Sequence, residues 1–412
     1  MTKTVYIVSA VRTPIGKFGG ALADFTSPDL GVIAVRAALE RAFGQPLPAE
    51  RMPGERATED DAPLPWRVDE LIFGNARSAG VGPNPARQIA WRSGLGDDVP
   101  AFTVNMACAS GLRSVMLGWQ QILLGQAEII VAGGTESMSR VPYLVDGRWG
   151  FKMGNQPLVD AMYRDGFLCP IAKLVMGETA EILAEQYKIA RVEQDAFSVE
   201  SHRRAARAAA ECHFKTEIIP IEKKDRKGSV TRLEKDEHVR PDATLEALGK
   251  LPPVFSKTGT VTAGNSSGIT DGAAAIVLAS EEKVRELKLK PLARIVDATV
   301  AAVDPRVMGI GPVPAVRALT RRTGTKVEDY DAVELNEAFA AQVIACDRDL
   351  HFNMERLNPN GGAIALGHPI GCTGGRILTT LVHELGGKPG SRGLATLCVS
   401  GGMGVAVEIE TV

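Results

Sequence analysis

Short runs of apolar and β-branched residues recur along the chain and alternate with amphipathic segments. Runs of this kind predict buried strands. The clearest are Val5 to Val8, Glu70 to Phe73, Phe102 to Val104, Ile129 to Val131, Ala275 to Leu278 and Leu394 to Val399. The 43 glycines and the 5% of aromatic residues indicate many tight turns and close backbone approaches. We therefore predict a layered α/β protein rather than a helical bundle.

The segment after Cys108 has the periodicity of an amphipathic helix. Its apolar residues recur at helical spacing: Leu112, Val115, Met116, Trp119, Ile122 and Leu123. Ser110 stands at the start of this segment, and serine is a preferred N-cap residue. We expect Cys108 to lie at a junction between a strand and a helix.

The two halves of the chain echo each other weakly. VDELIFGN at 68–75 resembles YDAVELNE at 330–337, and AEIIVAGGTE at 127–136 resembles ATLCVSGGMG at 395–404. This predicts an internal duplication. Between the halves, charged residues become more frequent and apolar runs become rarer, which predicts an inserted and more exposed subdomain at 138–268. Residues 45–65 contain five prolines and few apolar residues, and we expect an exposed loop there.

Composition narrows the classes of function. The 47 Lys and Arg residues are matched by 49 Asp and Glu residues, so the chain lacks the basic excess that binds nucleic acid. It has no apolar run of about 18 residues, no signal peptide and no peroxisomal tripeptide, so we expect a cytoplasmic protein without membrane contact. The six cysteines are too sparse for a disulfide scaffold and are expected to be reduced. No CxxC or HExxH motif supports a metal site.

Two cysteines and one histidine lie in glycine-rich turns that present single side chains. They are Cys108 in VNMACASGL, His368 in NPNGGAIALGHPIGCTGG and Cys398 in LCVSGGMG. Together they suggest one thiol that carries an acyl group, a second thiol that moves a proton, and an imidazole that activates a thiol or polarises a carbonyl. These three groups suit an enzyme that makes or breaks a carbon–carbon bond beside a thioester.

Each of these residues also has a plain structural explanation. Free cysteine is among the most buried residue types, so Cys108 and Cys398 can be core thiols. Small neighbours leave room for a substrate beside Cys108, and the N–H groups after Cys398 can line an oxyanion hole. The glycines around His368 permit close approach to a ligand, but they lack the GxGxxG spacing of a dinucleotide site. Asn336 can be a helix cap or can hold a catalytic water.

Several separate motifs then identify a family. They occur in this order: VSAVRTPIGKFGGAL, FGNARSAGVGPNPARQIA, NMACASGL, VMGETAE, GTVTAGNSSGITDGAAA, VELNEAFA, NPNGGAIALGHPIGCTGGR and LCVSGGMG. In these motifs the chain resembles the thiolases along nearly its whole length. The resemblance implies a duplicated α/β fold in five layers, αβαβα, with an inserted loop domain. It divides the chain into an N-terminal half at 1–137 and 269–291, a loop domain at 138–268 for coenzyme A binding and tetramerisation, and a C-terminal half at 292–412.

The resemblance also implies residue roles. Cys108 is the acylated nucleophile, His368 is its activating partner and Cys398 is the acid and base. Asn336 holds a water that forms one oxyanion hole with His368, while the N–H groups of Cys108 and Ser400 form the other. Most thiolases have glycine at the position of Ser400. Coenzyme A and acyl contacts are implied for Met176, Arg240, Phe255, Ala263, Ser267, Ala338 and Phe339.

The implied reaction is the condensation of two acetyl-CoA molecules to acetoacetyl-CoA and CoA, or the reverse thiolysis. No cofactor is expected, because CoA is itself substrate and product, and relatives commonly form homotetramers. Met176 resembles a residue that narrows the pocket for acetoacetyl-CoA, whereas Val175 stands where many short-chain enzymes have histidine. A degradative thiolase for longer 3-ketoacyl-CoA in fatty-acid β-oxidation is the main alternative. A carrier that binds acyl-CoA without turnover is the other.

Overall fold

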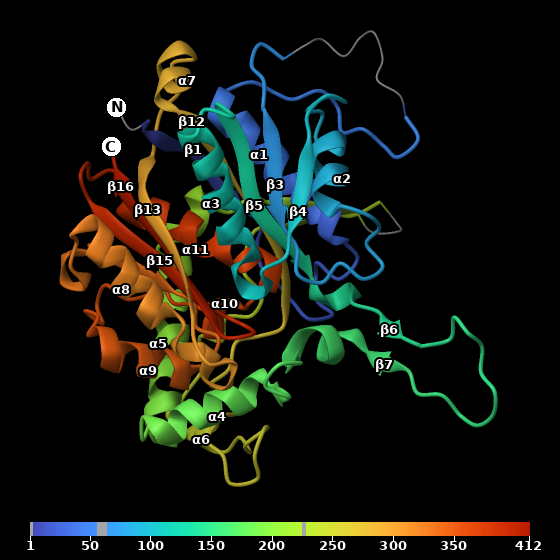
Figure 1. The fold of residues 1–412 in the computed structure, drawn as a ribbon, viewed down its shortest axis with the longest axis vertical. Coiled ribbons are helices and arrows are strands. Elements are labelled where there is room, and N and C mark those ends of the chain that lie inside the picture. The colour runs from blue at the N-terminus through green and yellow to red at the C-terminus, as the bar shows by residue number, and fades with distance from the viewer. Residues whose placement is uncertain (1–2, 56–63, 225–227) are drawn as a thin grey trace.

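The computed structural model describes residues 3–55, 64–224 and 228–412. Its elements form five layers in the order helix, sheet, helix, sheet, helix (Figure 1). The predicted layered α/β architecture is confirmed. Residues 56–63 of the predicted exposed loop and residues 225–227 of the charged insertion lie outside the described residues.

The sheet of the N-terminal half contains all but one of the predicted strands. In spatial order its strands are β4 (Ala101–Val104), β3 (Glu70–Gly74), β5 (Ile129–Ser137), β12 (Thr270–Ser280) and β1 (Val5–Arg12). β3 is parallel to β4 and β5, and β12 is antiparallel to β5 and β1. The two-residue strand β2 (Gly16–Lys17) pairs with the start of β12.

The C-terminal half repeats this arrangement. Its strands lie in the order β14 (Ala332–Leu335), β15 (Arg392–Val399), β16 (Met403–Thr411) and β13 (Ala293–Ala302). β14 and β15 are parallel, and β16 is antiparallel to both neighbours. A parallel bridge from Val333 to Leu357 stands where β4 lies in the first half. β1 and β13 pair through two residue pairs and join the two sheets.

This repetition confirms the predicted internal duplication. The two sequence echoes fall on matching strands, since 68–75 covers β3 and 330–337 covers β14, while 127–136 covers β5 and 395–404 covers β15. The match between distant segments follows from equal strand order and equal strand direction in the two sheets. Each half therefore has one central helix at an equivalent place.

The two central helices are α3 (Ser110–Leu123) and α11 (Ile370–Leu385), which lie between the sheets (Figure 1). Their apolar faces share one core with both sheets. The helices cross where both are rich in glycine. A Cβ on Gly374 would lie 2.2 Å from the Leu112 nitrogen, and a Cβ on Gly111 would lie 2.8 Å from the Gly375 nitrogen. Glycine lets the two backbones touch at this crossing.

Further helices cover the outer faces of the sheets. α1 (Ser27–Phe43) and α2 (Pro85–Arg92) pack on the first sheet, and α8 (Pro312–Thr323) and α9 (Ala340–Leu350) pack on the second. A capping box of Thr26 and Asp29 starts α1, and Gly44 ends it at a φ of 66°. The short helix α7 (Glu281–Glu286) follows β12. The short helix α10 (Ala363–Leu366) lies just before His368.

In the part of the insertion at 138–268 that the structure describes, no strand joins the large sheet. Its helices are α4 (Met176–Gln186), α5 (Arg191–Ala210) and α6 (Leu245–Gly249). Its strand pairs are β6 (Tyr143–Leu144) with β7 (Val159–Asp160), β8 (Leu168–Cys169) with β9 (Leu174–Val175), and β10 (Ile221–Lys224) with β11 (Val230–Leu233). The insertion also has two short 3₁₀ helices, η2 (Met138–Arg140) and η4 (His213–Thr216), and a short π-helix, η3 (Tyr163–Phe167). In the C-terminal half, η5 (Pro305–Ile310), which is kinked at Val307, and η6 (Val327–Asp329) are 3₁₀ helices.

The insertion docks on the C-terminal half through α5. Arg204 donates from Nη1 to the Leu357 carbonyl at 2.6 Å, and Ser201 donates from Oγ to Glu337 Oε2 at 2.7 Å. These bonds connect α5 to the chain segments that follow β14 in the C-terminal half. The domain boundaries predicted from the sequence stay predictions.

Candidate active site

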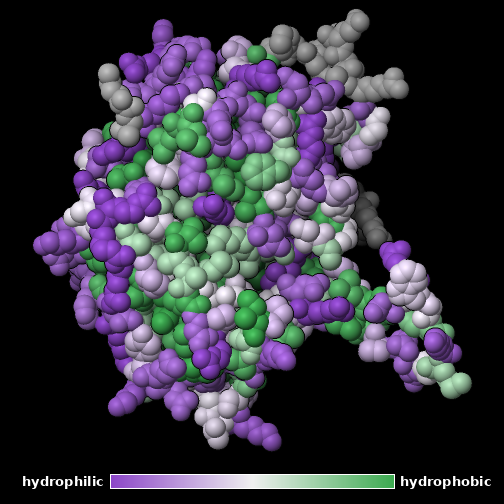
Figure 2. All heavy atoms as spheres, in the orientation of Figure 1, coloured by the Kyte–Doolittle hydropathy of each residue, from purple (hydrophilic) through white to green (hydrophobic). Residues whose placement is uncertain are grey.

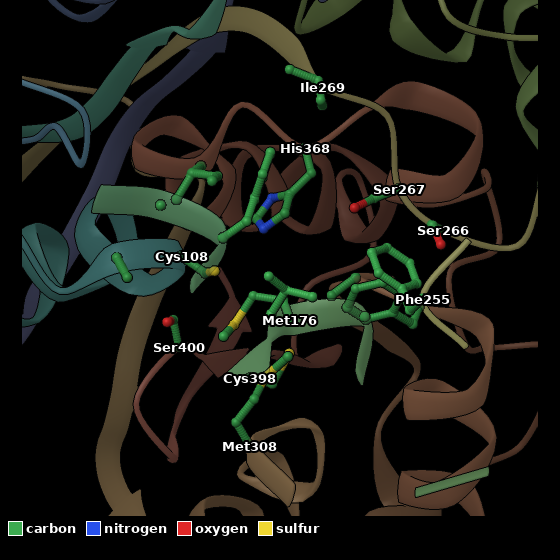
Figure 3. A pocket seen from close by; sticks show the side chains of 18 of the residues that line it. Cys108, Met176, Phe255, Ser266, Ser267, Ile269, Met308, His368, Cys398 and Ser400 are labelled. Atoms are coloured by element: carbon green, nitrogen blue, oxygen red, sulfur yellow. The ribbon is translucent and has the colours of Figure 1, made fainter. Parts of the chain in front are cut away.

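The three residues with candidate chemistry meet at one cavity. Cys108, His368 and Cys398 all line a space of about 290 Å³, and their side chains point into it (Figure 3). Cys108 comes from the N-terminal half, whereas His368 and Cys398 come from the C-terminal half. The insertion supplies a further wall through Met176 and Phe255. Residues separated by more than two hundred positions are therefore brought together by the fold.

A single 3₁₀ turn, η1 (Ala107–Ala109), holds Cys108 directly before α3. Ala107 has a φ of 45°, an uncommon conformation for a residue with a side chain. Such strain is often found where a reactive side chain must be aimed. Cys108 therefore stands at the positive end of a helix dipole, where an anion is favoured.

Ser110 has a different role from the predicted one. It is the first residue of α3, and the N-cap is Ala109, so the prediction of Ser110 as a cap was wrong. The Ser110 hydroxyl accepts a bond from the Met106 N–H at 2.9 Å and donates one to the Ala107 carbonyl at 2.7 Å. The side chain thus fixes the turn that carries the thiol.

Burial raises the pKa of the Cys108 thiol above its ordinary value. The backbone N–H of Ser400, the positive charge of Arg77 and the N–H of Cys108 itself act in the opposite direction. Both N–H groups that the family resemblance assigns to an oxyanion hole therefore face the sulfur. Because the thiol form prevails at neutral pH, Cys108 needs a proton acceptor before it can act as a nucleophile.

His368 is held as a neutral imidazole with a defined tautomer. Burial, followed by the charges of Arg376 and Arg77, lowers the pKa of His368 to about 3. Its Nδ1 lies 2.6 Å from the Thr373 hydroxyl, which lies 3.0 Å from the Pro369 carbonyl. Since the hydroxyl has one proton and the carbonyl can only accept it, the hydroxyl accepts from Nδ1–H.

The other ring nitrogen of His368 is consequently a proton acceptor. Nε2 is buried and has no hydrogen-bond partner among the residues the structure describes. The imidazole ring faces the same space as the Cys108 sulfur (Figure 3). A neutral imidazole with a free lone pair can accept the thiol proton.

Cys398 lies near the end of β15 and is fully buried. It packs with Met308, Ala338 and Phe339. Burial and the neighbouring Cys108 thiol raise the pKa of Cys398 well above the usual value for a thiol. A thiol of this kind becomes a strong base once it is ionised, which suits removal of a proton from carbon.

Asn336 is not a helix cap. It follows β14, but α9 begins four residues later and has Phe339 as its N-cap. The Asn336 N–H donates to the Thr396 carbonyl at 3.0 Å. Its side chain is fully buried, and neither amide atom has a partner within the described part of the chain. An amide with two unmet polar atoms is suited to holding a water.

Comparison with known proteins identifies the chain. The model of the thiolase N-terminal domain matches residues 5–50 and 56–282, and that of the thiolase C-terminal domain matches residues 289–411. The chain belongs to the thiolase family. It is 47% identical to acetyl-CoA acetyltransferase of Chromobacterium violaceum over 98% of this chain and 99% of the relative.

Two solved thiolase structures share the fold over the whole chain. Acetyl-CoA acetyltransferase of Bacillus anthracis has a TM-score of 0.91 at 43% identity, over 100% of this chain and 99% of that chain. Human mitochondrial 3-ketoacyl-CoA thiolase has a TM-score of 0.91 at 42% identity, over 100% of both chains. The five-layer thiolase fold expected from the motifs is confirmed.

Most of the thiolase residues singled out from the sequence line the cavity. Besides the three catalytic candidates they are Met176, Phe255, Ala263, Ser267, Ala338, Phe339 and Ser400. Phe255 and Phe339 meet edge to face at 6.3 Å. Phe255 can approach because its neighbour is Gly177, where a Cβ would lie 2.1 Å from the ring. The Ser267 N–H donates to the Ala338 carbonyl at 3.0 Å, so this wall joins the insertion to the C-terminal half.

Two of the expected thiolase residues do not line the cavity. Asn336 is buried but is not among the residues that line the cavity, and Arg240 is exposed. The Arg240 N–H donates to Nδ1 of the buried His202 at 3.2 Å. Burial and the neighbouring His238 lower the pKa of His202 to about 4, so its lone pair remains available for this bond. The coenzyme A contact of Arg240 stays a prediction.

Other lining residues were not found from the sequence. Arg77, Tyr163, Phe167, Met308 and Ile370 belong to the cavity wall. An apolar residue in a loop or helix gives no sign of which cavity it faces. Arg77 lies inside the FGNARSAG motif, and a lone charged residue in that glycine-rich stretch was the available signal.

The described residues contain no group of three or more His, Cys, Asp and Glu side chains that could hold a metal ion. All six cysteines are unpaired. In the same residues, no helix has both the length and the apolar character needed to cross a bilayer.

Proposed function

We propose that this thiolase catalyses the reversible condensation of two acetyl-CoA molecules to acetoacetyl-CoA and CoA through a thioester on Cys108. The observation that supports this most is the shared cavity of a nucleophilic thiol, a second thiol and a neutral imidazole with a free Nε2. The relatives named acetyl-CoA acetyltransferase, which span the whole chain, support the same substrate.

In the first half-reaction, His368 Nε2 takes the proton from Cys108 and the sulfur attacks the thioester carbonyl of acetyl-CoA. The negative charge on the carbonyl oxygen is held by the N–H groups of Cys108 and Ser400. Such preorganised donors are typically worth about a hundredfold or more in rate. The carbon–sulfur bond to CoA then breaks, and the proton leaves with CoA as its thiol.

In the second half-reaction, ionised Cys398 removes an α-proton from a second acetyl-CoA. Because CoA has left as its thiol, His368 Nε2 is again a free base, and it takes the proton of Cys398 within the shared cavity. His368 and a water on Asn336 hold the enolate oxygen. The enolate carbon attacks the acetyl group on Cys108, and the Cys108 sulfur leaves and takes back a proton from His368. Thiolysis follows the same path in reverse.

The acyl end of the cavity favours a short chain. Met176, Met308, Phe255 and Phe339 close it with bulky side chains around Cys398. Cleavage of longer 3-ketoacyl-CoA in fatty-acid metabolism is the second candidate. The 42% identity to human mitochondrial 3-ketoacyl-CoA thiolase, which covers both chains completely, supports this alternative.

We also propose that the protein forms a homotetramer and acts in the cytoplasm. The β6–β7 hairpin is an arm that extends away from the body (Figure 1), and hydrophobic as well as hydrophilic residues occur along it (Figure 2). Trp149 and Met153 on this arm are 91% and 92% exposed. Exposed apolar groups of this kind favour contact with another copy of the chain. Light scattering of wild type and Trp149→Ser tests this contact. If both proteins are tetramers, the arm does not contribute to the interface.

The function is tested by CoA-dependent cleavage of acetoacetyl-CoA beside a medium-chain 3-ketoacyl-CoA. We expect cleavage of acetoacetyl-CoA by the wild type and none by Cys108→Ala. Equal cleavage of both substrates would favour the degradative alternative. No cleavage of either substrate would contradict the enzyme assignment and leave the carrier.

A further inference from the structure

Arg77 is the only charged side chain among the described residues that line the active-site cavity. It is 7% exposed, and the rest of the lining is apolar or neutral. A buried cation is costly unless a partner satisfies it. The charge of Arg77 lowers the pKa of the Cys108 thiol, but this effect provides no hydrogen-bond partner for Nε of the guanidinium, so the burial of Arg77 calls for a further explanation.

The guanidinium of Arg77 is held in a fixed place. Nη1 donates to the Ala76 carbonyl at 3.2 Å. A Cβ on Gly166 would lie 2.7 Å from both Nε and Nη2, so the guanidinium packs directly on this glycine of η3. Nε has no hydrogen-bond partner, and no carboxylate of the described residues forms an ion pair with Arg77. The guanidinium group of Arg77 is therefore ordered before a ligand binds.

A buried carboxylate that interacts electrostatically with Arg77, Glu136, is already engaged by other donors. Oε1 of Glu136 accepts from Asn75 Nδ2 at 2.9 Å and from the Arg77 backbone N–H at 3.1 Å. Oε2 accepts from the N–H groups of Ala76 at 3.0 Å and Gly371 at 2.9 Å. Burial raises the pKa of Glu136, but all four partners are donors, which favours the ionised form. Glu136 balances the charge of Arg77 while the guanidinium remains available.

We propose that Arg77 binds a carboxylate at the far end of an acyl group carried by Cys108. The enzyme then transfers, besides acetyl, acyl groups derived from dicarboxylic acids. This inference rests on the proposed function, because it requires the thioester on Cys108. Guanidinium and carboxylate match as a bidentate pair, and arginine provides this geometry where lysine does not.

The chemical step is the same acyl transfer. The bond from the acyl carbon to the CoA sulfur breaks, the bond to the Cys108 sulfur forms, and CoA leaves as a thiol with the proton of Cys108. The distal carboxylate stays ionised and pairs with Arg77. In the thiolytic direction, a 3-ketoacyl-CoA with a terminal carboxylate is cleaved to acetyl-CoA and the CoA thioester of a shorter dicarboxylic acid.

The test compares acyl groups of equal shape and different charge. Single-turnover acylation of Cys108 is measured from glutaryl-CoA and from 5-methylhexanoyl-CoA, in which an isopropyl group replaces the carboxylate. Succinyl-CoA and 4-methylpentanoyl-CoA repeat the comparison with a shorter chain. We expect the wild type to prefer the charged member of one pair at least about 10-fold, as for a buried hydrogen-bonded charge. An equal or lower rate for the charged member of both pairs would overturn the proposal.

Variants locate the preference. Arg77→Met should reduce the ratio of the two rates about 10- to 100-fold. Any effect of Arg77 on the Cys108 thiol slows both substrates alike and cancels in the ratio. Arg77→Lys should keep part of the preference, and Gly166→Ala should reduce it by displacing the guanidinium. An unchanged ratio in Arg77→Met would place the carboxylate site elsewhere and refute the assignment.

Acylation of Cys108 by acetyl-CoA distinguishes a failure of this inference from a failure of the proposed function. If the wild type acylates Cys108 from acetyl-CoA but shows no charge preference, the carboxylate site alone is wrong. If no acyl-CoA acylates Cys108, the proposed function itself fails. Thermal unfolding of each variant verifies that it remains folded during the measurement.

Discussion

The two halves of the molecule have the same strand order and the same central helix, yet they present different chemistry to the cavity. Cys108 precedes α3 in the first half, and His368 precedes α11 in the second. A hydroxyl side chain of each central helix supports its catalytic neighbour. Ser110 bonds to the backbone of the turn that carries Cys108, whereas Thr373 bonds to the His368 ring.

This difference follows from what each group must do. A thiol has one rotatable bond and acts wherever its sulfur is placed, so a fixed backbone is sufficient. An imidazole must also present the correct nitrogen in the correct protonation state. Duplication therefore supplied one scaffold twice, and the supporting hydroxyl contacts the backbone in one half and the side chain in the other.

The largest expected effect is the loss of the thiol in the first half. Cys108→Ala should lower condensation and thiolysis by at least about 10⁴-fold, because no acyl-enzyme can form. Radioactive acetyl-CoA should label the wild type but not this variant. Cys398→Ala should still become labelled while losing both overall reactions, because its thiol acts after acylation.

Cys212→Ser is the matched control for these cysteine substitutions. Cys212 is exposed and lies outside the lining of the active-site cavity, so this variant should retain full activity. Labelling of Cys108→Ala, or normal condensation by Cys398→Ala, would contradict the assigned roles and the division of labour between the halves.

The next effect concerns the contact between the central helices. Gly374→Ala places a Cβ 2.2 Å from the backbone nitrogen of Leu112, so α11 must move away from α3. We expect a loss of about 3 kcal/mol in the free energy of unfolding and weaker catalysis, since Cys108 and His368 separate. Chemical denaturation measures the loss.

Gly249→Ala provides the comparison for this substitution. A Cβ on Gly249 would meet no atom within 4 Å, so the stability should be unchanged or slightly higher. Equal stability of Gly374→Ala and wild type would show that the two helices are not held together by close backbone contact.

The sequence was sufficient to predict much of the fold because its signals are local. Six apolar runs mark strands, and the periodicity after Cys108 marks α3. The two sequence echoes also predict the duplication, since they fall on equivalent strands. The joining of the sheets through two residue pairs of β1 and β13 depends on tertiary packing, and no local pattern indicates it.

The site was predictable as far as its residues lie in distinctive turns. Glycine-rich segments drew attention to Cys108, His368 and Cys398. Ser110 was assigned as a cap because propensity favours it, but the turn before α3 uses its hydroxyl instead. Arg77 was missed because its importance lies in the absence of a carboxylate partner, which only a folded structure can show.

A smaller effect tests whether Thr373 sets the tautomer of His368. Thr373→Val removes the acceptor for Nδ1–H, so Nε2 is less often the free base. We expect kcat to fall about 10- to 100-fold, a range found when a partner that orients a ligating histidine is lost. Thr373→Ser keeps the hydroxyl and should remain near wild type.

The measurement for Thr373 must separate orientation from folding. The rate of Cys108 alkylation by iodoacetamide is followed against pH, because it reports thiolate formation rather than substrate binding. Slower alkylation at neutral pH in Thr373→Val, with normal thermal unfolding, supports the orienting role. If Val and Ser variants behave alike, the hydroxyl is not required and the contrast with Ser110 disappears.

The smallest expected effect is a difference in how pH changes stability in the two halves. The pKa of His368 is about 3 in the folded protein and near 6.5 when exposed, so below pH 6.5 the unfolded chain binds a proton that the folded chain does not. Stability therefore falls as pH decreases. Between pH 6.5 and about pH 5, His368→Asn should avoid about 2 kcal/mol of this loss.

Cys108 should affect the alkaline side of the curve of protein stability against pH. Burial raises the pKa of its thiol, so the unfolded chain loses this proton first, and stability falls as pH rises above the ordinary range of cysteine. Denaturation curves across pH are compared for wild type, His368→Asn and Cys108→Ser. Each variant should flatten one limb and leave the other unchanged. Cys108→Ser could instead change the stability at acid pH as much as His368→Asn does. That result would show that the two residues titrate as one coupled pair, and that the two duplicated halves do not contribute separate titrations.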